Sequence, residues 1–167
     1  MIRTNLNAHE TISKADPRIE LRGRLDELNA RIILIQAHSL NHHLIDDLEE
    51  VREVITRLLK CEVKGENFGE LVLWGLHEDE IHTRSHNPKK YYDMDHIMPH
   101  RDMKRDAAEI NLLRTLVREA ELSACRAFGD YDPGRIIHIL NRLSSALYIL
   151  TYKYLPKGYD KTICFNK

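Results

Sequence analysis

Apolar residues recur every three or four positions along most of this chain, and few residues interrupt that helical pattern. Only 7 glycines and 5 prolines occur among 167 residues. The pattern is clearest over residues 17–39, 44–61, 103–128 and 133–155. Repetition at this spacing places the apolar residues on one face of an α-helix, and helices of this kind bury that face against one another. The sequence therefore predicts an all-α, antiparallel helical bundle.

Two Asp-Pro pairs mark helix starts. Asp16-Pro17 and Asp132-Pro133 each combine a capping side chain with a proline suited to the first helical position. The helix after Asp132 is apolar nearly all round, which predicts a place at the centre of the bundle. Residues 1–15 lack an apolar stripe and are expected to form an arm, whereas 16–167 form a single helical domain.

The middle of the chain, residues 63–101, is less regular. The stretch GELVLWGL (69–76) is expected to form a short strand or a buried turn. HEDEIHTRSH (77–86) predicts a short helix that stops at Asn87-Pro88.

Composition excludes some classes of partner. The formal net charge is −1, without the concentrated Lys/Arg field that nucleic-acid binding requires. No apolar run reaches the roughly 20 residues that cross a bilayer, and no charged-then-apolar leader opens the chain. Three scattered cysteines give no disulfide framework. We therefore expect a cytoplasmic protein that contacts neither nucleic acid nor membrane.

Polar residues on the predicted buried helices are candidates for a functional site. Arg114, Arg118 and Glu121 share one strip of a helix. Polar side chains also interrupt two other helices, at Asp26, Glu27, Asn29, Asn141, Arg142, Ser144 and Ser145. The spacing allows two interpretations. The charges form internal braces, Asp26 with Arg114 and Arg118 with Glu121, or the arginines line a site that binds an anion such as phosphate.

Histidine is concentrated in one segment of the chain. Five of the 10 histidines lie there: His77, His82, His86, His96 and His100. His82 and His86 have the i, i+4 spacing with which two imidazoles bind one metal, with Glu78, Asp95 or His96 as a third ligand. Backbone hydrogen bonding by these imidazoles is the alternative.

An acidic pattern, Glu49-Glu50-x-x-Glu53, is typical of some metal-dependent nucleotide hydrolases. A solvated helix face is the other interpretation of these three acids.

Three blocks of the sequence resemble ATP:cob(I)alamin adenosyltransferases: SKADPRIELRGRLDELNA (13–30), RTLVREAE (114–121) and LNRLSSALYIL (140–150). The segments GLHEDEIHTRSHNPKKYYDMDHIMP (75–99) and RDAAEINLLRT (105–115) resemble the ethanolamine-utilisation type. The resemblance implies about five helices, a homotrimer with sites between subunits, and hand-over to a cobalamin-dependent enzyme. It also implies attack by cob(I)alamin on the 5′ carbon of ATP, in the presence of Mg²⁺, to give adenosylcobalamin and triphosphate.

The resemblance also assigns roles to residues. Arg118 would bind the triphosphate, and Glu121 would hold that guanidinium or the nucleotide. Arg114 would pair with Asp26 across a subunit interface. Together with Arg118, these two residues would form the catalytic set. The residues expected to bind ATP or cobalamin are Lys14, Asn29, Glu121, Asn141 and Arg142. No residue is assigned as a ligand of a resident metal.

Some features depart from related proteins. The opening MIRTNLNAHETISKA does not reproduce the threonine- and glycine-rich ATP-binding stretch of propanediol-type relatives, although Thr4 and Thr11 are available as substitutes. Ser145 stands where many of those relatives have aspartate, and serine fits the ethanolamine branch. The Cys/His metal motif in the N-terminal region of longer ethanolamine-type enzymes is expected to be absent.

Two rival functions follow. One is a catalytically impaired cobalamin-binding or carrier protein built on the same bundle. The other is a nucleotide hydrolase that uses Glu49, Glu50 and Glu53.

Overall fold

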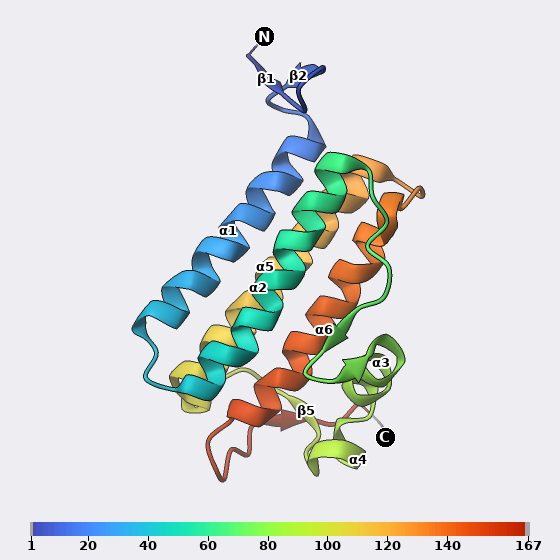
Figure 1. The fold of residues 1–167 in the computed structure, drawn as a ribbon. Coiled ribbons are helices and arrows are strands. Elements are labelled where there is room, and N and C mark those ends of the chain that lie inside the picture. Colours follow the sequence, from blue (N-terminus) through green and yellow to red (C-terminus); the bar gives the residue numbers. More distant parts are fainter. Residues whose placement is uncertain (1, 166–167) are drawn as a thin grey trace.

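The computed structural model describes residues 2–165 and confirms the predicted helical bundle. α1 and α2 run in opposite directions, as do α5 and α6, which lie side by side, whereas α2 and α5 run in the same direction (Figure 1). The long helices are α1 (Pro17–His38), α2 (His42–Lys64), α5 (Lys104–Phe128) and α6 (Ile136–Tyr154). Two short helices, α3 (Glu78–His86) and α4 (Pro88–Tyr92), bring the α-helices in residues 2–165 to six, against about five expected.

One Asp-Pro start signal marks its helix accurately, and the other is offset. Asp16 caps α1 by accepting a 2.9 Å hydrogen bond from the Arg18 backbone N–H. After Asp132, however, the chain first makes a 3₁₀ turn, η2 (Pro133–Arg135), and α6 begins only at Ile136. The Asp132 carboxylate still serves as a cap, because it accepts hydrogen bonds from the backbone N–H groups of Ile137 and His138.

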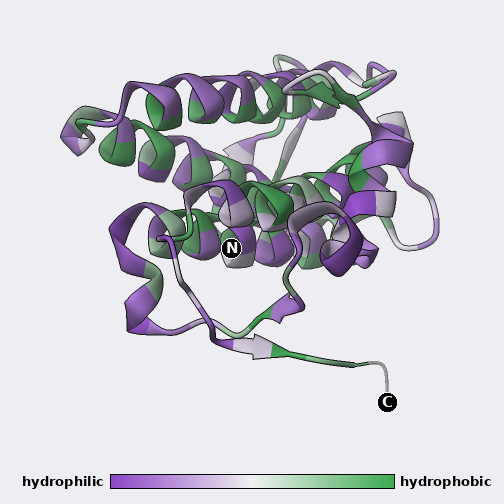
Figure 2. Ribbon diagram, turned by 90° about the horizontal axis from the view of Figure 1, so that it is seen from below, coloured by the Kyte–Doolittle hydropathy of each residue, from purple (hydrophilic) through white to green (hydrophobic). Residues whose placement is uncertain are grey.

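The core lies between the apolar faces of the long helices, with hydrophilic residues turned outward (Figure 2). Leu25, Ile55, Leu113 and Leu143 from the four long helices are all fully buried. Because α6 packs against α5, α3 and α2, its buried residues cover more than one face. This packing explains why the sequence of α6 is apolar on several sides.

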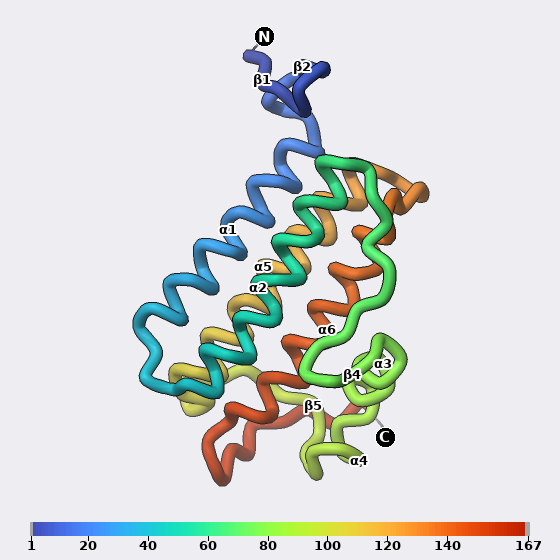
Figure 3. Tube along the Cα trace, in the orientation of Figure 1, coloured from blue at the N-terminus to red at the C-terminus, as the bar shows by residue number. Residues whose placement is uncertain are grey.

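The middle segment folds onto the side and end of the bundle. Strands β3 (Val72–Leu73) and β4 (Leu76–His77) form a two-stranded hairpin, in line with the expected strand or turn. The predicted short helix is α3, which ends at His86 before Asn87-Pro88. Further on, β5 (His96–Ile97) pairs with β6 (Thr162–Ile163), which brings the C-terminal segment against the middle of the chain (Figure 3). A 3₁₀ turn, η1 (Arg101–Met103), precedes α5.

The N-terminal residues form a hairpin of β1 (Arg3–Asn5) and β2 (Thr11–Ser13) beyond the start of α1. The sequence predicted an arm here, and its pattern gave no sign of the two strands. Leu6 is 3% exposed, and its carbonyl accepts a 2.6 Å hydrogen bond from Arg22 Nη1. The hairpin is therefore attached to the bundle. Between residues 2 and 165 no helix combines the length and the hydrophobicity needed to cross a membrane.

Candidate functional site

A cavity of about 400 Å³ opens between α3, β5, α5, α6 and the C-terminal segment. Helix α5 contributes both predicted arginines, and α6 contributes both predicted serines. The lining residues are Ser85, His86, His96, Ile97, Pro99, Asn111, Arg114, Arg118, Ser144, Ser145, Tyr148, Thr151 and Phe165. Four sequence-predicted polar residues thus lie around one space.

The cavity lining contains two arginines and no aspartate or glutamate. Arg114 is half-buried, and its Nε donates a 3.2 Å hydrogen bond to Asn111 Oδ1. Burial lowers the pKa of the Arg114 guanidinium, and the nearby charge of Arg118 acts in the same direction. Arg118 is exposed to the cavity one helical turn away. Two guanidinium groups among hydroxyl groups, with no carboxylate in the lining, suit an anionic ligand such as a polyphosphate.

The predicted internal braces are wrong. Asp26 is exposed on α1 and pairs with no residue of the described chain. Within residues 2–165, Arg118 likewise forms no ion pair with Glu121. The carboxylate of Glu121 accepts a 3.0 Å hydrogen bond from Asn141 Nδ2 instead, which joins α5 to α6. Both arginines therefore remain available to a ligand or to another subunit.

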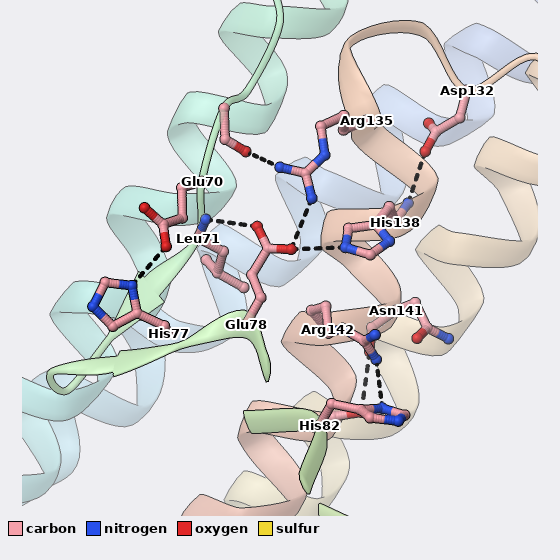
Figure 4. Close-up of polar contacts among 12 residues, drawn as sticks. Glu70, Leu71, His77, Glu78, His82, Asp132, Arg135, His138, Asn141 and Arg142 are labelled. Carbon is pink, nitrogen blue, oxygen red and sulfur yellow. Dashed lines mark hydrogen bonds and ion pairs between the residues drawn. The ribbon is translucent and has the colours of Figure 1, made fainter. Parts of the chain in front are cut away.

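The other predicted binding residues lie outside the cavity lining. Arg142 Nη1 donates a 2.8 Å hydrogen bond to His82 Nδ1, while its buried Nε has no partner in the described chain (Figure 4). Desolvation lowers the pKa of His82, and the charge of Arg142 acts in the same direction. Asn29 on α1 has a buried Oδ1 without a hydrogen bond. Lys14 is exposed directly after β2.

A cluster that the sequence did not reveal fixes α3 to the start of α6 (Figure 4). The Glu78 carboxylate accepts hydrogen bonds from Leu71 N–H, Arg135 Nη2 and His138 Nε2 at 2.7 to 2.9 Å. Burial would raise the pKa of Glu78, but these donors outweigh it and lower the pKa to about 2. Arg135 precedes the helix, so periodicity gave no signal for the cluster.

Of the two interpretations of the histidine segment, the described residues do not support a metal site. In residues 2–165, no three His, Cys, Asp or Glu side chains converge closely enough to hold a metal ion. Glu78 is committed to Arg135 and His138, and His86 Nδ1 donates to the carbonyl of His82 at 2.9 Å. Because His82 accepts from Arg142, the histidines take the alternative role of hydrogen bonding.

The acidic pattern on α2 is likewise committed to structure. Hydrogen bonds from Arg52 and Gln36 lower the pKa of Glu49 to about 2. Glu50 accepts a 2.7 Å hydrogen bond from the Trp74 backbone N–H. These contacts, and the lack of a metal-holding group in the part of the chain that the structure describes, remove the observation that favoured a hydrolase.

Comparison with known proteins gives consistent results. The cobalamin adenosyltransferase family model matches residues 3–154. Corrinoid adenosyltransferase EutT of Escherichia coli K12 is 35% identical over 151 residues, which cover 88% of this chain and 56% of that protein. EutT of Salmonella typhimurium is 36% identical over 151 residues, which again cover 88% of this chain and 56% of that protein. The chain thus spans about half the length of these curated relatives.

Solved structures show the same fold. A variant PduO-type ATP:corrinoid adenosyltransferase from Lactobacillus reuteri, complexed with cobalamin and ATP, superimposes with a TM-score of 0.71 at 16% identity, covering 96% of this chain and 95% of that one. Another variant complexed with ATP gives 0.66 at 17%, covering 90% and 87%. The family match establishes that the chain belongs to the cobalamin adenosyltransferase family, and the similarity to EutT supports the ethanolamine-utilisation type.

Proposed function

We propose that this protein transfers the 5′-deoxyadenosyl group of ATP to the cobalt of cob(I)alamin, giving adenosylcobalamin and triphosphate. The observation that carries the proposal is the cavity lined by Arg114 and Arg118 without any carboxylate, in a chain of this family. The reduced cobalt supplies the nucleophile, which suits a site that contains no activated protein nucleophile. The chain's own task is to hold two substrates in line and to stabilise the departing triphosphate.

The predicted residues divide this task. Arg118, exposed in the cavity, would bind the triphosphate as negative charge develops on it. Glu121 and Asn141, hydrogen-bonded to each other, would contact the nucleotide from adjoining helices. Arg142, Asn29 and Lys14 complete the proposed binding set; Arg142 and Asn29 each hold a buried polar atom that has no partner within residues 2–165.

Mg²⁺ would enter with ATP. The cavity lining has no carboxylate, and the described chain offers no three-residue metal site. Mg²⁺ prefers carboxylate, phosphate and water oxygens, so the triphosphate would supply the main ligands.

A homotrimer would complete the site. Asp26 is exposed on α1, while half-buried Arg114 has no acidic partner in the chain as described. A contact between subunits would pair these two charges. Exposed Ile33 and Leu34 on α1 add apolar surface for such an interface. The hairpin that precedes Lys14 lies at the opposite end of the bundle from β5 and α3 (Figure 1), so Lys14 would serve the site of a neighbouring subunit. We also propose a cytoplasmic location and delivery of the product to a cobalamin-dependent enzyme.

An anaerobic assay tests the proposal. The protein is mixed with ATP, Mg²⁺ and chemically reduced cobalamin, and the loss of cob(I)alamin absorbance is followed. Protein-dependent formation of light-sensitive adenosylcobalamin is the expected result. Saturable cobalamin binding without product would favour the carrier alternative, for which the unmatched N-terminal ATP-binding stretch is the supporting observation. If the protein neither binds cobalamin nor forms product, both functions are overturned.

A further inference from the structure

Two histidines in the cavity lining, His86 and His96, belong to hydrogen-bond networks that determine which ring nitrogen carries the proton. For His96, the network passes through two tyrosines of α6. His96 Nδ1 lies 3.0 Å from Tyr148 Oη, and Tyr148 Oη lies 3.0 Å from Tyr152 Oη. Tyr148 Oη also accepts a 3.1 Å hydrogen bond from the Ile97 backbone N–H. Tyr152 Oη donates at 2.9 Å to the carbonyl oxygen of Asp95.

Counting hydrogens leaves one arrangement. A carbonyl oxygen only accepts, so the single hydroxyl hydrogen of Tyr152 is directed to Asp95. The hydrogen between the two tyrosines must then come from Tyr148. Since that hydrogen is used, the contact between His96 and Tyr148 requires a hydrogen on His96 Nδ1. In the neutral imidazole, Nε2 consequently carries a lone pair and no hydrogen.

The same reasoning applies to His86. Its Nδ1 lies 2.9 Å from the carbonyl oxygen of His82, which can only accept. Neutral His86 therefore also has Nδ1–H and a bare Nε2. Neither Nε2 has a hydrogen-bond partner in the described chain. His82 is the opposite case, because its Nδ1 accepts from Arg142 and its hydrogen lies on Nε2.

The cavity thus has two chemically different sides. Arg114 and Arg118 on α5 offer only donors and positive charge, whereas the neutral forms of His86 and His96 each offer an Nε2 acceptor. A complementary ligand presents anionic oxygens to the first side and neutral N–H or O–H groups to the second. In the proposed reaction, the anion is triphosphate, and neutral N–H donors are the primary amides around the corrin ring.

We propose that His86 and His96 are specificity-determining residues that accept hydrogen bonds from the peripheral amides of the corrinoid through their Nε2 atoms. This assignment rests on the proposed function. It differs from metal ligation, since it uses the imidazoles as neutral acceptors for the substrate's rim. Tyr148 acts as a positioning residue, because its hydroxyl sets the tautomer of His96.

The tautomers are tested first by ¹⁵N NMR of histidine-labelled protein, above pH about 8.5, where an ordinary imidazole is neutral. His96→Asn and His86→Asn variants assign the two signals. We expect the Nδ1–H tautomer for His96 and His86 and the Nε2–H tautomer for His82. Tyr148→Phe should release His96 to the mixed tautomers of a free imidazole. An Nε2–H signal for His96 in the unmodified protein overturns the proposal, whether or not the protein is an active enzyme.

Measurements of corrinoid binding test which group of the ligand donates the hydrogen bond to His96 Nε2. Equilibrium titrations compare cobinamide with an analogue whose side-chain amides are replaced by esters, which accept but cannot donate. His96→Asn, which keeps a donor near Nδ1 but removes the Nε2 acceptor, should weaken cobinamide binding about three- to tenfold. His96→Gln places an oxygen near Nε2 and should restore most of the affinity. His43→Asn, at an exposed position on α2, is the matched control and should change nothing.

Two results overturn the assignment to corrinoid amides. One is an equal loss of affinity for the ester analogue in His96→Asn. The other is weakened ATP binding with unchanged cobinamide binding, which would identify a ribose hydroxyl as the donor. If the unmodified protein binds no corrinoid at all, the proposed function is contradicted. The tautomers found by NMR do not depend on that result.

Discussion

Asn141 donates a 3.0 Å hydrogen bond to Glu121, and this contact joins the two central helices, α5 and α6. The carboxylate of Glu121 is thereby held by α6 instead of neutralising Arg118 one turn away on α5. The guanidinium that would meet the triphosphate is therefore not paired with this acid. A preorganised cation of this kind stabilises a developing anion without further rearrangement.

Replacing Arg118 with alanine should lower the rate of adenosylcobalamin formation by about 100-fold or more, because one charge-stabilising donor is lost. Folding should be unaffected, since the side chain is exposed. Arg126→Ala is the control: Arg126 lies two turns further along α5, where it pairs with Glu20 outside the cavity. Steady-state rates and thermal melting of both variants make the comparison. Unchanged turnover in Arg118→Ala would refute its role.

Replacing Asp26 with alanine should weaken self-association if its carboxylate meets Arg114 of a neighbouring subunit. Loss of one partner leaves the half-buried guanidinium without its counter-charge, at a cost of several kcal/mol. Glu27→Ala is a matched control, because Glu27 is the next exposed acid on α1 and pairs within its own helix with Arg24. Sedimentation velocity over a concentration series measures the effect. Equal behaviour of the two variants would rule out the Asp26–Arg114 contact.

The sequence predicted the long helices well because each of them buries a continuous apolar face. Leu21, Leu25, Leu28 and Ile32 recur at helical spacing and are all fully buried. The shift in the start of α6 follows from the backbone: Gly134 and Arg135 both have a φ of +65°, so helical dihedrals begin only at Ile136. The N-terminal hairpin was missed because Leu6 is a single apolar residue without a repeating pattern.

Some of the site could be found from sequence and some could not. Arg114, Arg118, Ser144 and Ser145 lie on helices whose phase the apolar residues define, so their convergence on one cavity could be anticipated. The Glu78–Arg135–His138 cluster and the His96–Tyr148 contact join segments more than fifty residues apart. No local pattern encodes such a separation, and only the folded chain reveals these contacts.

Replacing Arg22 with methionine should loosen the N-terminal hairpin. Arg22 donates to the Leu6 carbonyl and pairs with Glu62, whose side chain is 0% exposed. An isolated two-stranded hairpin is marginally stable, so loss of this charge-assisted contact should speed its backbone hydrogen exchange roughly tenfold. Arg24→Met, which removes an arginine paired with partly exposed Glu27 on the same helix, should leave the exchange unchanged. Protection of the hairpin retained in Arg22→Met would contradict the anchoring role.

Glu78 should make stability depend on pH. Its folded pKa of about 2 lies below the ordinary value of 4.5, so its contribution is present above pH about 4.5 and is lost as the pH falls towards 2. With the side chain 12% exposed, the full contribution is about 3 kcal/mol at most. Glu78→Gln should therefore be destabilised at pH 7, and its difference from the unmodified protein should shrink by more than half near pH about 3.

Urea unfolding at several pH values measures this difference. Glu70→Gln is the control, since Glu70 and its partner His77 are 63% and 59% exposed and an exposed pair contributes little. A destabilisation of Glu78→Gln that stays constant with pH would show that the carboxylate charge is not responsible.

Gly134→Ala should destabilise the fold because the position tolerates no side chain. Gly134 has a φ of +65°, and an added Cβ would lie 2.4 Å from the carbonyl oxygen of Glu66. Relief of that clash would also disturb the 2.9 Å hydrogen bond from the Phe68 N–H to the Gly134 carbonyl. We expect a loss of about 2 kcal/mol or more in the free energy of unfolding. Gly23→Ala in α1, where nothing lies within 4 Å, should instead stabilise by about 0.5–1 kcal/mol. Chemical denaturation measures the free energy of unfolding of both variants. Similar changes in the two variants would contradict the close approach of η2 to the end of α2.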